Sequence, residues 1–334
     1  MQTSSKKLIA VLGPTSSGKS DYAIRLAREV DSEIISVDSR QVYRGMDIGT
    51  GKIPRDFSGN YKLQITNTKR RDKDLFFSEG IRHHLLDVAS PKREYNVTHF
   101  LRDAKKAITD IEKRGKVPIL CGGTTFWVEA LLLGTSFPEV KPDKALRAKL
   151  SKLSVETLFK MLQEKDHERT ANIDAKNKVR LIRALEIIET LGKVPSLGRH
   201  CEESSTKQSR NSWIATSFDK NQKTRDDKIH IIALNPPKEI LHARIEKRLK
   251  ERLKQGMVEE VKRLHNEGVS WKRLEGFGLE YRWCTRLLQE KISREDMEMK
   301  LLKESKHYAK RQLTFLRRLE RNGLGIEWIT KASL

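Results

Sequence analysis

The stretch Gly13-Pro14-Thr15-Ser16-Ser17-Gly18-Lys19-Ser20 (GPTSSGKS) decides how the first part of this sequence folds. It matches the G-x-x-x-x-G-K-[ST] pattern of a phosphate-binding loop, in which backbone N–H groups surround adjacent phosphates. The apolar run at residues 7–12 predicts a buried strand before the loop, and helical apolar spacing begins after it, at residue 23. Lys19 would add a positive charge, and Ser20 could ligate Mg²⁺. The loop recognises phosphates without selecting a nucleoside.

Further strands and helices alternate along the chain. Apolar runs at residues 33–37, 117–121 and 229–234 predict buried strands, and residues 100–111 have helical periodicity. This alternation is typical of a parallel α/β sheet, whose ligands bind at the carboxyl ends of the strands. Asp38 and Gly122-Gly123-Thr124 follow two of these strands, so we expect them to share one pocket with the phosphate loop. Asp38 could act as a base, ligate a metal, or only cap the following turn.

The rest of the chain is mainly helical and polar. We expect an α/β fold: a phosphate-loop core with a parallel sheet, an all-helical insertion and a helical C-terminal region. The predicted parts are core residues 1–137, the helical insertion 138–200, a polar connector 201–228, and a core-completing and basic helical region 229–334.

Composition narrows the possible partners. The chain has 334 residues, 37% of them apolar, and a formal net charge of +22, which favours a polyanionic partner, either nucleic acid or an anionic membrane surface. No apolar run approaches the roughly 18 to 20 residues that span a bilayer. Three widely separated cysteines suggest neither a disulfide framework nor a metal site. We therefore expect a soluble, cytoplasmic protein with an anionic partner. Separately, we expect that it has no membrane partner and is a monomer.

Taken together, the motifs resemble those of the tRNA dimethylallyltransferase family (tRNA isopentenyltransferases). The resemblance runs from about residue 7 to 318, in order, and no zinc-finger motif follows, which favours the bacterial type. The matching stretches are GPTSSGKS at 13–20, DSRQVY at 38–43, IGTGK at 48–52, GGT at 122–124, RALE at 183–186 and AKRQLT at 309–314. The sequence departs from the family pattern at Trp127, Val179 and Phe315.

The resemblance implies a donor and an acceptor. The loop residues Gly13, Pro14, Thr15, Ser16, Ser17, Gly18, Lys19 and Ser20 would bind the diphosphate of dimethylallyl diphosphate, with Mg²⁺ on Ser20. The acceptor would be N6 of the adenosine 3′ to a tRNA anticodon. That amine is a poor nucleophile and benefits from a base, for which Asp38 is the candidate. Lys19 and Arg244, and more weakly Arg248, would stabilise the leaving diphosphate.

The resemblance also implies contacts with the tRNA anticodon stem-loop. From the residue pattern alone, the arginines among these positions could equally be ordinary solvated charges. The implied tRNA-binding residues are Asp38, Ser39, Arg40, Gln41, Thr124, Arg147, Arg180, Arg183, Lys310 and Arg311.

Other functions stay open at this point. An adenylate isopentenyltransferase would use the same loop and base on free AMP, ADP or ATP, but it would need no long basic surface. A small-molecule kinase would hold ATP in the loop, with Asp38 activating a hydroxyl group. In a non-enzymatic RNA-binding protein, an intact phosphate loop beside a carboxylate would have no explanation.

Overall fold

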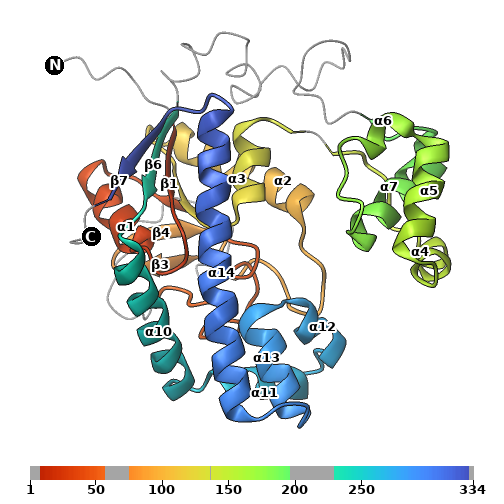
Figure 1. Ribbon diagram of the computed structural model, residues 1–334. Coiled ribbons are helices and arrows are strands. Elements are labelled where there is room, and N and C mark those ends of the chain that lie inside the picture. The colour runs from red at the N-terminus through yellow and green to blue at the C-terminus, as the bar shows by residue number, and fades with distance from the viewer. Residues whose placement is uncertain (1–7, 57–74, 136, 196–228, 331–334) are drawn as a thin grey trace. The chain divides into compact units, whose positions relative to one another are not determined.

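The computed structural model describes residues 8–56, 75–135, 137–195 and 229–330. The chain forms two compact units, one made of Met1–Leu132 with Thr216–Leu334 and the other of Leu133–Ala215 (Figure 1). The predicted connector at 201–228 lies outside the described residues.

A mixed sheet forms the centre of the larger unit. Its order is β3 (Phe76–Ser78), β4 (Ile81–His84), β2 (Ile34–Val37), β5 (Ile119–Gly122), β1 (Leu8–Leu12), β6 (Ile229–Leu234) and β7 (Ile326–Ile329). Among the described residues, all of its pairings are parallel except that of β3 with β4. The predicted α/β core is confirmed.

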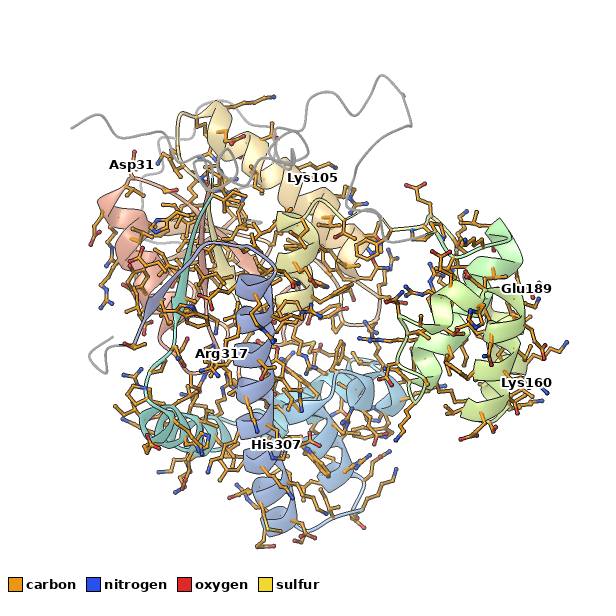
Figure 2. All side chains as sticks on the ribbon, turned by 45° about the horizontal axis from the view of Figure 1, so that its top comes forward. Asp31, Lys105, Lys160, Glu189, His307 and Arg317 are labelled. Atoms are coloured by element: carbon orange, nitrogen blue, oxygen red, sulfur yellow. The ribbon has the colours of Figure 1, made fainter. Side chains whose placement is uncertain are left out.

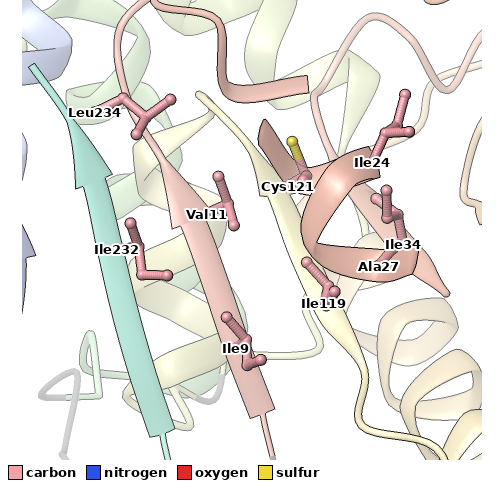
Figure 3. Close-up of a cluster of buried hydrophobic side chains, with 10 residues drawn as sticks. Ile9, Val11, Ile24, Ala27, Ile34, Ile119, Cys121, Ile232 and Leu234 are labelled. Carbon is pink, nitrogen blue, oxygen red and sulfur yellow. The ribbon is translucent and has the colours of Figure 1, made fainter. Parts of the chain in front are cut away.

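The central strands are apolar because helices cover both faces of the sheet. All five residues of β1, LIAVL, are buried. Ile9, Val11, Ile119 and Ile232 of neighbouring strands pack in one cluster with Ala27 and other residues of α1 (Lys19–Glu29), as Figure 3 shows. In-register pairing of Leu12 with Gly122, and of Val37 with Gly122, brings the carboxyl ends of β1, β5 and β2 together.

Helices of the larger unit fall into an N-terminal and a C-terminal set. The first set adds α2 (Val97–Lys113), which has a capping box of Asn96 and His99, and α3 (Thr125–Leu132). The second set comprises α10 (Lys238–Lys254), α11 (Met257–Asn266), α12 (Trp271–Gly276), α13 (Leu279–Leu288) and α14 (Arg294–Arg321). The long helix α14 packs against α10, α13 and α3 (Figure 1).

All the regular elements among the described residues of the smaller unit are helices. It contains α4 (Lys144–Ser151), α5 (Val155–Lys165), α6 (His167–Thr170) and α7 (Lys178–Leu191), with Lys160 on α5 and Glu189 on α7 labelled in Figure 2. Its core is a separate apolar cluster that includes Leu150, Leu158 and Leu181. An apolar cluster of its own is what an independent helical unit needs.

Three strands were not predicted. We expected only helices after the strand at residues 229–234, and this is wrong at β7, where Ile326-Glu327-Trp328-Ile329 pairs in parallel with β6. Polar residues hide β4, whose sequence is IRHH, and β3 has only three residues. A polar strand and a very short one contain no continuous apolar run, so that signal does not reveal β4 or β3.

No helix within the described ranges has the length and apolar content that crossing a membrane requires.

A buried carboxylate supports the β2–β4 side of the sheet. Glu33, 5% exposed, accepts hydrogen bonds from Arg114 Nη2 at 2.8 Å and pairs with His84 Nε2 at 2.7 Å. Burial by itself would raise the pKa of Glu33, but the hydrogen bonds from His84 and Arg114 outweigh it and lower the pKa to about 2. A carboxyl group whose pKa is lower in the folded state than in the unfolded state stabilises the fold at pH values above its unfolded-state pKa. This stabilisation is lost as the pH falls toward the folded-state pKa.

We therefore predict that Glu33→Gln lowers the free energy of unfolding by about 3 kcal/mol near pH 7, and by about 2 kcal/mol near pH 3.5. Urea denaturation at both pH values measures this difference. Glu29→Gln, an exposed carboxylate on α1, is the control and should change little. A Glu33→Gln effect of equal size at both pH values would contradict the prediction.

Candidate functional site

The phosphate loop connects β1 to α1 as the sequence predicts. Gly18, in the left-handed conformation with φ of 88°, precedes Lys19 at the start of α1. The Lys19 ammonium folds back and donates to Pro14 O at 3.1 Å. The loop therefore places a lysine and a helix N-terminus at the carboxyl end of the sheet, where both favour an anion.

A cleft of about 1020 Å³, including open space at its mouth, lies beside this loop within the larger unit. The ends of β2 and β5, the segment 49–53, and helices α10, α13 and α14 complete its walls. Its charged and polar lining includes Thr15, Lys19, Ser20, Asp38, Ser39, Arg40, Gln41, Arg248, Arg252, Glu280, Ser305, Tyr308 and Gln312.

Positive charges are crowded on one side of the cleft. Burial lowers the pKa of Lys19, and the nearby Arg248 guanidinium adds to this effect. Burial, and then the neighbouring Arg252, lowers the pKa of Arg248 to about 10. Cationic groups in a shared buried space lower one another's pKa, and the binding of an anion among them stabilises their charged forms. The cleft therefore has the electrostatics of an anion site.

Both arginines are held by backbone oxygens of the segment 49–51. Arg248 Nη2 donates to Gly51 O at 3.0 Å, and Arg252 Nη1 donates to Gly49 O at 3.3 Å and to Glu280 at 3.0 Å. A Cβ atom on Gly51 would lie 1.6 Å from Arg252 Nη2 and 1.9 Å from Arg248 Nη2. Only glycine allows both guanidinium groups to approach the backbone this closely.

Glu260 of α11 fixes that segment from behind. Its buried carboxylate accepts the backbone N–H groups of Asp47, Ile48 and Gly49 at 2.8 to 3.0 Å, and the Tyr281 hydroxyl at 2.8 Å. Burial, and then the charge of Glu260, raises the pKa of Tyr281 well above its ordinary value, which keeps this hydroxyl a donor. A fully hydrogen-bonded buried carboxylate makes the segment rigid.

The Asp38 carboxylate follows β2 and has a structural role as well as a place in the cleft. Its Oδ1 accepts N–H bonds from Arg40 at 2.8 Å and Gln41 at 3.2 Å, so it caps the turn after the strand. Its Oδ2 has no hydrogen-bond partner among the described residues. The turn thus orients the carboxylate, and one oxygen stays available to a ligand.

Two neighbouring predicted residues also stabilise the site. Thr124 Oγ1 accepts the Ser39 N–H at 3.0 Å, which joins the turn after β5 to the turn after β2. The Gln41 amide donates to Gly51 O at 3.3 Å and to Thr50 O at 3.4 Å. These side chains connect the pieces of the cleft wall.

The predicted residues separate into three groups. The phosphate loop, Asp38, Ser39, Arg40, Gln41 and Thr124 come together at the cleft, whereas Arg244 is not among its lining residues. Lys310 and Arg311 are exposed on α14, the helix on which Figure 2 labels the exposed residues His307 and Arg317. Arg147, Arg180 and Arg183 belong to the smaller unit.

Within the smaller unit, two of those arginines meet a buried acid. Glu186, 1% exposed, accepts Arg147 Nε and Nη2 at 2.8 Å and also pairs with Arg183. Burial alone would raise the pKa of Glu186, but these hydrogen bonds prevail and lower the pKa to about 2. Arg180 is exposed one turn before Arg183. The Glu186 carboxylate of the RALE stretch therefore orients the partly exposed guanidinium groups of Arg147 and Arg183.

Sequence reasoning missed several cleft residues, namely Arg252, Glu280, Ser305, Tyr308 and Gln312. The last three lie three and four positions apart on α14, a spacing that puts them on one face of a helix. Burial, and then the nearby Asp38 carboxylate, raises the pKa of Tyr308 to about 12, so its hydroxyl stays protonated at neutral pH. The spacing of these three residues indicates that they share one face of α14, but it does not show that this face lines the cleft.

Comparisons with known proteins show which proteins this chain resembles. The chain is 38% identical over 324 residues to tRNA dimethylallyltransferase 2 of Treponema denticola, covering 97% of this chain and 95% of that one. It is also 38% identical over 332 residues to tRNA dimethylallyltransferase 1 of Azobacteroides pseudotrichonymphae, covering 98% and 94%.

Solved structures match as well. The full-length tRNA isopentenylpyrophosphate transferase of Bacillus halodurans superposes with a TM-score of 0.61 at 28% identity, covering 98% of this chain and 90% of that one. The solved structure of a eukaryotic dimethylallyltransferase acting on tRNA matches with a TM-score of 0.71 at 24% identity. The match covers 98% of this chain and 75% of that one and shows the same fold. The family model for IPP transferase matches residues 41–319, and the chain belongs to the IPP transferase family.

Proposed function

We propose that this protein transfers the dimethylallyl group of dimethylallyl diphosphate to N6 of the adenosine 3′ to the anticodon of tRNA, and releases diphosphate. One observation carries the proposal: Lys19 of the phosphate loop, Arg248 and Arg252 of α10, and the Asp38 carboxylate line the same cleft. The names of the relatives support tRNA as the acceptor and dimethylallyl as the group transferred.

The donor diphosphate would lie against the phosphate loop. Lys19, the N-terminus of α1 and Arg248, whose Nη1 is 3.5 Å from Thr15 Oγ1, would neutralise its charge. The structure favours Arg248 and Arg252 for this role over Arg244, because these two line the cleft. As the allylic C1–O bond breaks, charge grows on the leaving oxygen, and fixed cations stabilise that charge most.

The acceptor amine would form the new bond to C1 as the C1–O bond breaks. Its N6 loses a proton, and the Asp38 carboxylate would accept it through the oxygen that the turn does not use. A positioned base of this kind contributes about 10²- to 10⁴-fold in rate.

Mg²⁺ fits the oxygen-rich side of the cleft. The Ser20 hydroxyl at the start of α1 and the Asp38 carboxylate are hard oxygen donors that line the same space. Ser20 would hold the ion, which when bound supplies charge neutralisation for the diphosphate.

The tRNA would meet basic residues outside the cleft as well. We propose contacts with the exposed Lys310 and Arg311 of α14, and with Arg147, Arg180 and Arg183 of the smaller unit. The formal net charge of +22 favours such a partner, and the affinity should fall steeply with salt. At the cleft, Ser39, Arg40, Gln41 and Thr124 would surround an adenosine that has left its stack.

Asp38→Asn tests the base. The amide oxygen can still cap the turn but the side chain cannot accept the N6 proton, so the single-turnover rate of tRNA prenylation should fall about 10²- to 10⁴-fold. Nucleoside mass spectrometry of digested tRNA measures the product. The control is Asp31→Asn, an exposed acid two residues after the end of α1. Prenylation at the wild-type rate by Asp38→Asn would remove Asp38 from the mechanism.

Offering AMP in the same reaction separates the rival function. Dimethylallyl found on tRNA alone supports the proposal, and dimethylallyl found on AMP would instead identify an adenylate isopentenyltransferase. ATP turnover with no prenyl transfer would identify a kinase-like enzyme.

The arginines of α10 make a matched comparison. Arg248→Ala should reduce kcat/KM for dimethylallyl diphosphate by about 10²-fold, because a buried cation at the leaving group is lost. Arg244→Ala should have a smaller effect, and Lys247→Ala, exposed on the same helix, should have almost none. Steady-state kinetics with varied donor and saturating tRNA measures all three. A larger loss for Arg244→Ala than for Arg248→Ala would return the role to Arg244.

A further inference from the structure

One buried amide joins parts of the cleft that are far apart in sequence. Gln312 of α14 is 3% exposed. Its Oε1 accepts the backbone N–H of Thr15 at 2.8 Å, and its Nε2 donates to Gly123 O at 2.8 Å. Thr15 belongs to the phosphate loop and Gly123 to the turn after β5, so a single side chain bridges both.

The bridge continues where the sheet stops. Pairing of β1 with β5 ends at Leu12 and Gly122, so beyond these residues the strand ladder no longer fixes the loop against the turn. Gln312 supplies the next cross-connection. It fits tightly, because a Cβ atom on Gly123 would lie 2.3 Å from Gln312 Nε2. A glycine at 123 therefore makes room for this amide.

The bridged segments adjoin the two halves of the proposed site. Thr15 lies beside Arg248 on the donor side. The residue after Gly123 is Thr124, whose hydroxyl accepts the Ser39 N–H next to Asp38 on the acceptor side. A shift of either segment would change the distance between the diphosphate and the base.

We infer that Gln312 is a positioning residue that sets the phosphate loop at a fixed distance from the Asp38–Thr124 side of the cleft. This inference rests on the proposed function. Misplacement of reacting groups by about 1 Å can cost about 10²-fold in rate, so the bridge has a kinetic consequence beyond its contribution to folding.

Two substitutions separate hydrogen bonding from packing. Gln312→Met keeps a similar volume and removes both hydrogen bonds. Gln312→Glu keeps an acceptor for the Thr15 N–H, but it places a second oxygen against Gly123 O. Lys303→Gln, exposed on the same helix, is the matched control. Each variant is purified as the full chain, and its melting temperature is recorded.

The first measurement is calorimetric titration with inorganic pyrophosphate and Mg²⁺. We expect the affinity for pyrophosphate to fall roughly 10-fold in Gln312→Met and in Gln312→Glu, and kcat for tRNA prenylation to fall roughly 10- to 100-fold. The tRNA dissociation constant, from filter binding, should stay within about threefold because the basic surface residues are unchanged. Lys303→Gln should match the wild type in pyrophosphate affinity and kcat.

Variants that melt at a lower temperature but keep wild-type pyrophosphate affinity and kcat would overturn the inference, since Gln312 would then serve stability only. A different result would count against the proposed function itself, namely a wild-type protein that binds pyrophosphate but prenylates no tRNA. In that case a loss of pyrophosphate affinity in the variants would still support Gln312 as the residue that positions the loop.

Discussion

The crowding of buried positive charges around one small space is the constraint on which the rest of the larger unit depends. Lys19, Arg248 and Arg252 would repel one another if nothing opposed them. Glu280 pairs with Arg252, and the backbone oxygens of Pro14, Gly49 and Gly51 accept hydrogen bonds from Lys19, Arg252 and Arg248 respectively. Burying charges is costly unless they are paired and hydrogen-bonded, so the fold must keep these partners in place. An anionic ligand completes the arrangement.

The C-terminal helices supply two of these cations and the side chains that hold their partners in place. Helix α10 carries the arginines, α11 carries Glu260, and α13 carries Glu280 and Tyr281. Glu260 and Tyr281 act only through the segment 47–49, yet they decide where the oxygens of that segment lie. Lys52, the last residue of the IGTGK stretch, has a side chain that is 2% exposed. It pairs with Asp47 and Asp87 and so fixes the carboxyl end of that stretch. The IGTGK stretch is therefore a scaffold for the cations and does not itself need to touch a ligand.

Local patterns made the core predictable. The phosphate loop and the strands β1, β2, β5 and β6 have short-range signals, either a glycine pattern or a continuous apolar run. β7 (IEWI) has only four residues and is interrupted by Glu327, and β4 (IRHH) is mostly polar, so neither has such a signal. The cleft contacts of Gln312, Glu260 and Arg252 join segments about 200 or more residues apart. Single-sequence periodicity says nothing about such pairs, whereas the family resemblance found their stretches without explaining their contacts.

The Thr15–Gln312 contact has a consequence for how the protein is made, because it spans 297 positions of the chain. Strand β1 lies between β5 and β6, so one of its two neighbours is synthesised only after residue 229. A ribosome therefore releases the phosphate loop long before the strand, arginines and amide that complete its surroundings. Contacts between distant segments form slowly, since a long loop must close before they contribute. The nascent chain cannot assemble the whole cleft until α14 (Arg294–Arg321) has emerged, so the anion site is completed only after these residues have left the ribosome.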